Sequence, residues 1–204
     1  MTASTGVPVG KERRAYAAQP AHYVSLDKEV LVSNEYTDQT THCHNRRYLQ
    51  EILESQIAVS RQYKFPLTLV LAEIAHLRQI QFTYGQLTAE TILRELARII
   101  RFSVRTTDLP VRYNEDTFAI LLLHSNQAGG KVVSERLKAA IAGHNFSGEG
   151  GNLMVMLNFG ISDQLSYYDQ RGHDLIAAAG KALAQAKADG EGSIVRASEI
   201  KALD

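Results

Sequence analysis

Hydrophobic residues recur with two different periods along residues 45–196, and these periods predict alternating helices and strands. From Arg46 to Gln62, leucine and isoleucine return at about every third or fourth position, which is typical of an amphipathic helix. Leu67–Ile74, which follows Pro66, is a short apolar run typical of a buried strand. The same reasoning predicts helices at Thr88–Val104, Gln127–Ala142 and Asp174–Ala188. It predicts further strands at Val111–Tyr113, Thr117–Leu123, Leu153–Ser162 and Ser193–Arg196.

The order of these elements predicts the fold class. The strands Val111–Tyr113 and Thr117–Leu123 are joined by the polar Asn114-Glu115-Asp116, which favours an antiparallel hairpin. The other predicted strands alternate with helices. We therefore predict an α+β fold close to the ferredoxin-like arrangement, with a central, mainly antiparallel sheet flanked by helices.

Residues 1–36 differ in composition from the rest of the chain, because they are rich in Ala, Thr, Gly, Pro and Ser. They lack the apolar run of a secretory signal and carry Lys11-Glu12-Arg13-Arg14 instead. We predict a flexible N-terminal arm at 1–36, with one short strand at Glu29–Ser33, followed by a single domain at 37–204. The alternative is that the arm becomes ordered when it docks on a protein partner.

Charge and cysteine content narrow the functional classes. The chain of 204 residues has 22 basic and 22 acidic residues, and this balance argues against a nucleic-acid polymer as partner. A net charge of zero does not exclude a local cluster of arginines. Cys43 is the only cysteine, which rules out an internal disulfide and favours a reducing compartment. The longest apolar runs are far shorter than the roughly 20 residues that span a bilayer, so we expect a soluble, cytoplasmic protein with no membrane span.

Five short segments, at Asp38–Arg47, Glu73–Glu90, Arg112–Phe118, Asn158–Ser162 and Ala186–Gly190, carry the clearest pattern. Their residues, order and spacing resemble the landmarks of the GGDEF domain family, the diguanylate cyclases that condense two GTP molecules into cyclic di-GMP. The resemblance covers most of the chain, from about residue 38 to residue 195. It implies the nucleotidyl-cyclase palm, which is a ferredoxin-like fold.

The catalytic motif departs from the family pattern. Two signature glycines, which let backbone N–H groups approach a GTP phosphate, correspond to Asn114 and Glu115 here. The acidic positions that hold magnesium correspond to Glu73 and Asp116. The next signature residue, a glutamate in the family, is Thr117, which offers no carboxylate.

The nucleotide-binding positions are changed as well. The guanine-reading asparagine and aspartate correspond to Gln81 and Glu90, each one methylene longer, and a phosphate-binding arginine corresponds to Glu191. The resemblance thus implies a degenerate GGDEF domain that is catalytically inactive and needs no magnesium cofactor. The alternative is a weak diguanylate cyclase or a GTP-binding regulator that uses Glu73 and Asp116.

A second family site, the product-binding R-x-x-D motif, corresponds to Arg105-Thr106-Thr107-Asp108. The motif is short, and Arg171-Gly172-His173-Asp174 also fits it. Arg105 lies nine positions before Asn114, which is the spacing found in the family. Arg136 corresponds to a further family arginine on the next helix. A guanidinium pairs with O6 and N7 of guanine, and a carboxylate accepts from its N1–H and amino group.

These features predict a non-catalytic cyclic di-GMP receptor that binds the dinucleotide at Arg105, Asp108 and Arg136. We expect it to signal to a protein partner through residues 1–36 and to form a ligand-induced dimer. Two alternatives stay open: Arg105 and Asp108 form only a surface ion pair, or the whole chain is a ligand-independent interaction module.

The segment His42-Cys43-His44 carries metal-ligand residue types, but adjacent side chains point apart and no second cluster has zinc spacing. We predict no metal site there. Cys43 stands where the family has leucine, so we expect it to be a small buried hydrophobic residue.

Overall fold

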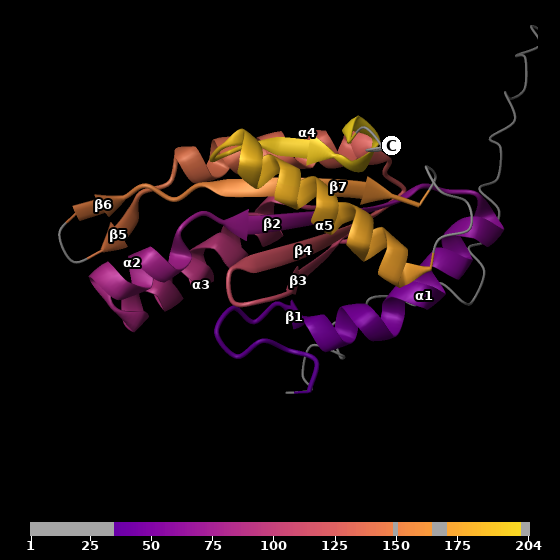
Figure 1. The fold of residues 1–204 in the computed structure, drawn as a ribbon. Coiled ribbons are helices and arrows are strands. Elements are labelled where there is room, and N and C mark those ends of the chain that lie inside the picture. Colours follow the sequence, from indigo (N-terminus) through magenta and orange to yellow (C-terminus); the bar gives the residue numbers. More distant parts are fainter. Residues whose placement is uncertain (1–34, 149–150, 165–170, 201–204) are drawn as a thin grey trace, which may run out of the picture.

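Six strands form the central sheet of the molecule (Figure 1). This computed structural model describes residues 35–148, 151–164 and 171–200, so the predicted strand Glu29–Ser33 and nearly all of the predicted arm lie outside the described residues. The strand order is β1 (His44–Asn45), β3 (Leu109–Arg112), β4 (Thr117–Leu123), β2 (Leu67–Ile74), β7 (Leu157–Asp163) and β8 (Ile194–Arg196). β2 is antiparallel to β4 and β7, and β3 is antiparallel to β4, whereas only the edge pairs β1–β3 and β7–β8 are parallel. The predicted fold class is confirmed.

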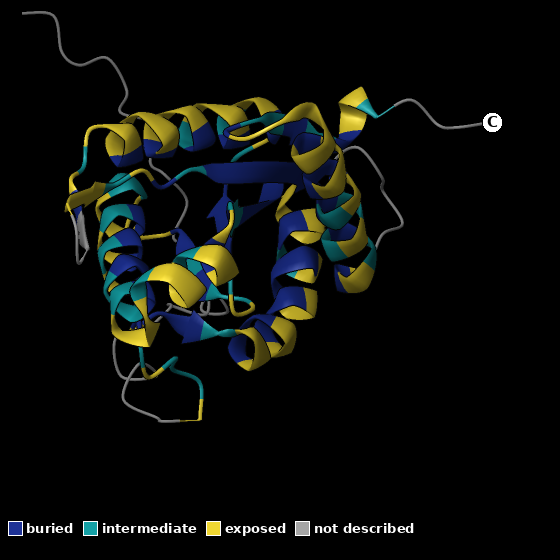
Figure 2. Cartoon of the chain, turned by 60° about the vertical axis from the view of Figure 1, so that its left-hand side comes forward, coloured by how far each residue is buried: buried dark blue, intermediate teal, exposed yellow. Residues whose placement is uncertain are grey.

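Helices cover both faces of the sheet. α1 (Arg46–Tyr63) and α5 (Gly172–Asp189) pack on one face, and α5 crosses in front of the strands in Figure 1. α2 (Leu77–Tyr84), α3 (Gln86–Ser103) and α4 (Gln127–Ala142) pack on the other face. Figure 2 shows the result, with buried residues facing the sheet and exposed residues facing outward. No helix in the described ranges is long and apolar enough to cross a membrane.

The continuous apolar run of β2 follows from this three-layer arrangement. Val70, Ala72 and Ile74 join the hydrophobic cluster under α3 and α4. Leu69 and Leu71 alternate with them and join the cluster under α1 and α5. Successive strand residues point to opposite faces, so a strand covered on both faces is apolar at nearly every position.

Gly160 of β7 allows the backbone of α5 to come close to the sheet. A Cβ atom at this position would lie 2.3 Å from the Ala179 carbonyl oxygen and 2.3 Å from the Leu183 nitrogen, both backbone atoms of α5. Rigid backbone cannot move aside as a side chain can, so only glycine fits here.

Several elements differ from the sequence-based prediction. α2 was not predicted, because Leu77 is its only buried residue and the helix therefore lacks an apolar stripe. The predicted strand Leu153–Ser162 was wrong at its start. Leu153, the first residue of the predicted strand, belongs instead to β6 (Gly151–Leu153). β6 pairs with β5 (Phe146–Gly148) in a separate hairpin. Residues 154–156 are in no strand, since the pairing of β7 with β2 ends at Leu157 opposite Ile74.

The other predicted helices and strands are confirmed to within two residues at each end. The short parallel strand β1 was not predicted. Its two residues are too few to show a period.

Candidate functional site

The turn between β3 and β4 carries the altered signature residues. Asn114 and Glu115 are exposed at this turn. Arg46 Nη1 lies 3.5 Å from Asn114 Oδ1, and Arg78 Nη2 lies 3.7 Å from Glu115 Oε2. Both positions therefore place side chains, one of them anionic, where the resemblance implies bare backbone for a phosphate.

Glu73 and Asp116 lie at neighbouring strand ends, as their correspondence to a shared site predicts. Glu73 stands opposite Thr117 in the β2–β4 register, and the Ile74 N–H donates to the Asp116 carbonyl at 2.8 Å. Each carboxylate already has a partner within the chain. Lys187 Nζ lies 2.6 Å from Glu73 Oε1, and Thr117 Oγ1 donates to Asp116 Oδ1 at 2.9 Å. In the described part of the chain, no three His, Cys, Asp or Glu side chains gather closely enough to hold a metal ion.

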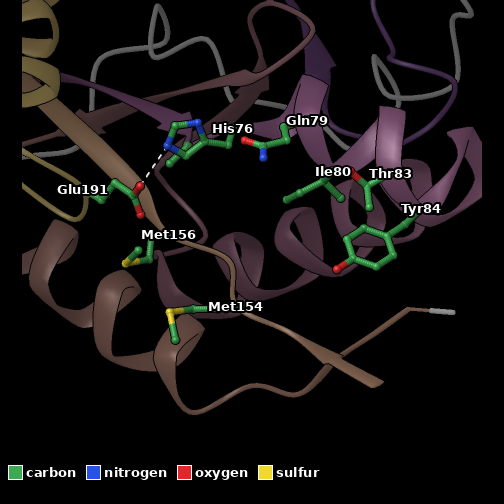
Figure 3. Close-up of a pocket in the computed structure, with 9 residues that line it drawn as sticks. His76, Gln79, Ile80, Thr83, Tyr84, Met154, Met156 and Glu191 are labelled. Atoms are coloured by element: carbon green, nitrogen blue, oxygen red, sulfur yellow. Dashed lines mark hydrogen bonds and ion pairs between the residues drawn. The ribbon is translucent and has the colours of Figure 1, made fainter. Parts of the chain in front are cut away.

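Glu191 is held by an ion pair with His76 (Figure 3). His76 Nε2 lies 2.8 Å from Glu191 Oε1, and His76 adopts a left-handed backbone conformation (φ 56°) just before α2. The pair borders a pocket of about 280 Å³ between α2 and the segment that carries Met154 and Met156. The carboxylate that replaces a phosphate-binding arginine is thus turned towards the start of α2.

Gln81 and Glu90, the two guanine-reading positions, are brought together by a residue that sequence reasoning missed. The Gln81 amide donates to the side chain of Gln86, and Gln86 Nε2 donates to Glu90 Oε1 at 2.9 Å. Arg94 lies 3.7 Å from Glu90. The side chains of Gln81 and Glu90 are therefore linked through Gln86 in a series of hydrogen bonds.

Arg105, Asp108 and Arg136 line one pocket of about 180 Å³. Arg105 and Asp108 belong to the turn between α3 and β3, and Arg136 projects from α4. Asp108 is only 8% exposed, whereas both arginines are exposed. The structure thus brings together the three residues that the sequence assigns to one ligand.

The Asp108 carboxylate also stabilises its own turn. Its Oδ2 accepts from the Arg105 backbone N–H at 2.9 Å, and the Asp108 N–H donates to the Arg105 carbonyl at 3.0 Å. Burial raises the pKa of Asp108, and the backbone hydrogen bonds from Arg105 and Leu123 and the charges of Arg105 and Arg136 offset only part of that effect.

The second R-x-x-D segment provides an internal comparison. The Arg171 N–H donates to Asp174 Oδ2 at 3.0 Å, and the Asp174 N–H donates to the Arg171 carbonyl at 3.0 Å. The turn itself is therefore a property of the motif. What distinguishes the first copy is the burial of Asp108 and the convergence of Arg136 on the same pocket.

A second pocket, of about 270 Å³, shares Arg105 and Asp108 and is bordered by Cys43 and His44. Cys43 is 2% exposed, which confirms the expectation of a buried residue, and burial raises the pKa of its thiol. Burial lowers the pKa of His44, whose ring stacks on Tyr48 with centroids 4.0 Å apart. Arg105 and Asp108 of the R-x-x-D turn thus line both pockets.

Comparisons with known proteins identify the family of the chain. The family profile for the diguanylate cyclase GGDEF domain matches residues 35–193. The chain belongs to the GGDEF domain family. The response regulator PleD from Caulobacter vibrioides is 30% identical over 161 residues, which are 78% of this chain and 35% of PleD. The chain therefore spans about a third of the length of that relative.

Two solved GGDEF structures share the fold. The GGDEF domain of DgcB from Caulobacter crescentus, in complex with c-di-GMP, superposes with a TM-score of 0.75 at 18% identity and covers 82% of this chain and 96% of its own. The diguanylate cyclase SiaD from Pseudomonas aeruginosa, in complex with its activator SiaC, superposes with a TM-score of 0.76 at 23% identity and covers 82% of this chain and 64% of its own. At such identities the likeness shows the fold alone.

Within this GGDEF domain, sequence reasoning found the positions that converge but missed their internal partners. His76 occupies a position without a landmark role in the resemblance, and Gln86 stands where the family pattern has histidine, so neither was singled out as a partner. Lys187 lies in a landmark segment, but nothing in the sequence pairs it with Glu73.

Proposed function

We propose that this GGDEF domain is a non-catalytic receptor for cyclic di-GMP, which binds the dinucleotide at Arg105, Asp108 and Arg136. One observation carries the proposal: these three side chains, from two separate elements, line the same pocket. In the described ranges neither guanidinium lies within ion-pair distance of a carboxylate, so both are open to a ligand.

The residue types suit a guanine dinucleotide. A guanidinium presents two parallel donors to O6 and N7 of guanine or to phosphate oxygens. The Asp108 carboxylate can accept from the guanine N1–H and amino group. Because Asp108 is already buried, less solvent has to be removed when it meets the base.

The altered catalytic positions support the non-catalytic part of the proposal. Glu73 and Asp116 are each held by a neighbour, Lys187 and Thr117 respectively, and Thr117 supplies no carboxylate of its own. Magnesium in phosphoryl-transfer sites is usually bound by one or two carboxylates together with waters and substrate phosphates, so the ion would have to compete with Lys187 and Thr117 for Glu73 and Asp116. The proposed function therefore includes no magnesium and no phosphoryl transfer.

Calorimetry with cyclic di-GMP tests the receptor. We expect heat of binding for the native protein and an affinity roughly 5- to 150-fold weaker for Arg105→Ala, since a bidentate pair contributes about 1–3 kcal/mol. Arg171→Ala is the matched control, because Arg171 begins an R-x-x-D turn of the same geometry, and should bind like the native protein. No heat for the native protein, or equal affinities for the two variants, would contradict the proposal.

Incubation with GTP and magnesium, followed by chromatography, tests the absence of catalysis. We expect no cyclic di-GMP among the products. Product that disappears in Asp116→Ala would instead establish a weak cyclase. If neither nucleotide changes the melting temperature, the chain is an interaction module, since a ligand at a hundred times its dissociation constant adds about 2.7 kcal/mol.

We further propose that the receptor signals to a protein partner through residues 1–36. Glu35 and Tyr36, at the end of this segment, contact the domain: Glu35 pairs with Arg47 at 2.6 Å, and the Tyr36 carbonyl accepts from the Asn45 N–H at 2.8 Å. Deleting residues 1–34 should leave cyclic di-GMP binding intact and abolish capture of the partner.

A further inference from the structure

One face of α3 presents a row of exposed arginines. Arg94, Arg98 and Arg101 follow one another at intervals of four and three residues, which places them on the same side of a helix. At 1.5 Å per residue this part of the row is about 10 Å long. The turn after α3 adds Arg105, which is also exposed.

Contacts within the chain leave most of this charge uncompensated. Only Arg94 has a carboxylate partner among the described residues, Glu90 at 3.7 Å. Glu95, the other acidic residue of α3, lies 2.8 Å from His144 instead. Arg101 donates to the Thr41 carbonyl at 2.8 Å, which orients the guanidinium without neutralising it. Neighbouring like charges destabilise a helix, and the Glu90–Arg94 pair and the Arg101–Thr41 bond offset only part of this cost.

An aromatic side chain stands within the row. Phe102 is 83% exposed and lies one turn of the helix after Arg98. A single exposed aromatic residue is unremarkable by itself. Arginine and phenylalanine together, however, are the residue types enriched at protein interfaces, where arginine pairs with carboxylates in a bidentate manner.

We propose that Arg94, Arg98, Arg101 and Phe102 form a docking surface for an acidic segment of another protein. Charge complementarity identifies the occupant: carboxylates at one-turn spacing meet the arginines, and an apolar residue covers Phe102. The residues of this chain outside the structure before position 35 do not fit, because residues 1–34 carry four basic and three acidic residues. A nucleic-acid polymer fits less well, because the chain has no net positive charge to support a short basic row.

The surface goes beyond the proposed function and does not depend on it. It uses none of the residues that line the pocket of Arg105, Asp108 and Arg136. Arg101 lines the neighbouring pocket that shares Arg105 and Asp108, whereas Arg98 and Phe102 line neither pocket. Variants of Arg98 and Phe102 should therefore leave cyclic di-GMP binding unchanged.

Fluorescence anisotropy tests the surface with a fluorescein-labelled helical peptide. The peptide carries glutamates at intervals of four and three residues and one leucine beside them, and a matched peptide carries glutamine in place of glutamate. We expect the native protein to bind the glutamate peptide at least tenfold more tightly than the glutamine peptide. Arg98→Glu should weaken binding of the glutamate peptide at least tenfold, and Phe102→Ser about fivefold.

Lys181→Glu is the matched control, because Lys181 is exposed on α5, on the opposite face of the sheet, and undergoes the same change of charge. It should change peptide affinity by less than twofold. If Arg98→Glu and Lys181→Glu weaken peptide affinity equally, binding depends only on the net charge of the protein, and the proposal is overturned. Tighter, Arg98-dependent binding of a 20-base-pair DNA duplex or of phosphatidylglycerol vesicles would overturn it as well.

Two further measurements keep the result interpretable. Arg98→Gln, which removes the charge without reversing it, should weaken binding while the melting temperature stays within a few degrees of the native value. Calorimetry with cyclic di-GMP on Arg98→Glu separates the two proposals: loss of peptide binding with native ligand heat supports the docking surface, whereas peptide binding without ligand heat contradicts only the receptor.

Discussion

At the scale of the residue, Asp108 combines a structural bond with the chemistry of a ligand site. Its carboxylate accepts from the Arg105 N–H, as the carboxylate of Asp174 does from the Arg171 N–H. Unlike Asp174, it is buried in a pocket with two guanidinium groups. A group of this kind is expected where binding rather than stability sets the residue type.

The raised pKa of Asp108 predicts a specific dependence of stability on pH. The folded state holds the proton to a higher pH than the unfolded state, whose pKa is about 3.9. The burial penalty is therefore absent at low pH, grows as the pH rises through the folded pKa, and is complete above it. Asp108→Asn removes the charge and keeps an oxygen that can accept from the Arg105 N–H.

The amide offers a single acceptor oxygen to the two backbone donors, Arg105 and Leu123, so the prediction concerns the trend with pH. We expect the free energy of unfolding of Asp108→Asn, relative to that of the native protein, to rise between pH 3 and pH 7. Urea unfolding between pH 3 and 7.5 measures both curves. The variant should also lose cyclic di-GMP affinity, because an amide cannot accept two hydrogen bonds from guanine as a carboxylate does. A relative stability that falls as the pH rises would show that the charge itself stabilises the turn.

At the scale of the element, the contact between β7 and α5 depends on one glycine. Gly160 lets the backbone of α5 approach β7, and Gly180, on the helix itself, has no atom within 4 Å of its missing Cβ. The two positions therefore predict opposite effects of the same substitution.

Gly160→Ala should lower the free energy of unfolding by about 1–3 kcal/mol or more, because the new methyl group overlaps rigid backbone. Gly180→Ala should raise it by about 0.4–1 kcal/mol, because alanine restricts the unfolded chain and meets no clash. Thermal and urea unfolding of the two variants check the pair. A neutral Gly160→Ala would mean that α5 can move away from the sheet without cost.

At the scale of the whole molecule, the size of the proposed ligand predicts that a second copy of the chain takes part in binding. Cyclic di-GMP has two guanines, and the pocket of about 180 Å³ at Arg105 and Arg136 leaves part of the dinucleotide outside. The part left outside can meet a second copy. The ligand shifts this association only if it binds the dimer more tightly than the monomer.

Sedimentation velocity should therefore show the native protein moving from one chain mass to two as cyclic di-GMP is added. Arg105→Ala should stay monomeric, and Arg171→Ala should dimerise like the native protein. If calorimetry detects binding while the native protein stays monomeric at saturating ligand, the receptor works without dimerisation and the dimer is wrong.

The sequence by itself determined the family, the α+β class and most of the elements. Segments such as Arg46–Tyr63 and Leu67–Ile74 could be predicted from the local sequence. A helix or strand that buries one or both faces has apolar residues at positions set by its geometry. The landmark spacing also assigned Glu73, Asp116 and Arg105 to their sites. These assignments use only distances along the chain.

Only the tertiary structure decided which partners these residues have. The pairs Glu73–Lys187 and His76–Glu191 join residues more than a hundred positions apart, and the burial of Asp108 depends on α4 as well as on its own turn. α2 and the separate β5–β6 hairpin lack a local period for another reason, since α2 buries only Leu77 and each strand of the hairpin has three residues. A single sequence records what each residue can do, whereas the fold decides which of them meet.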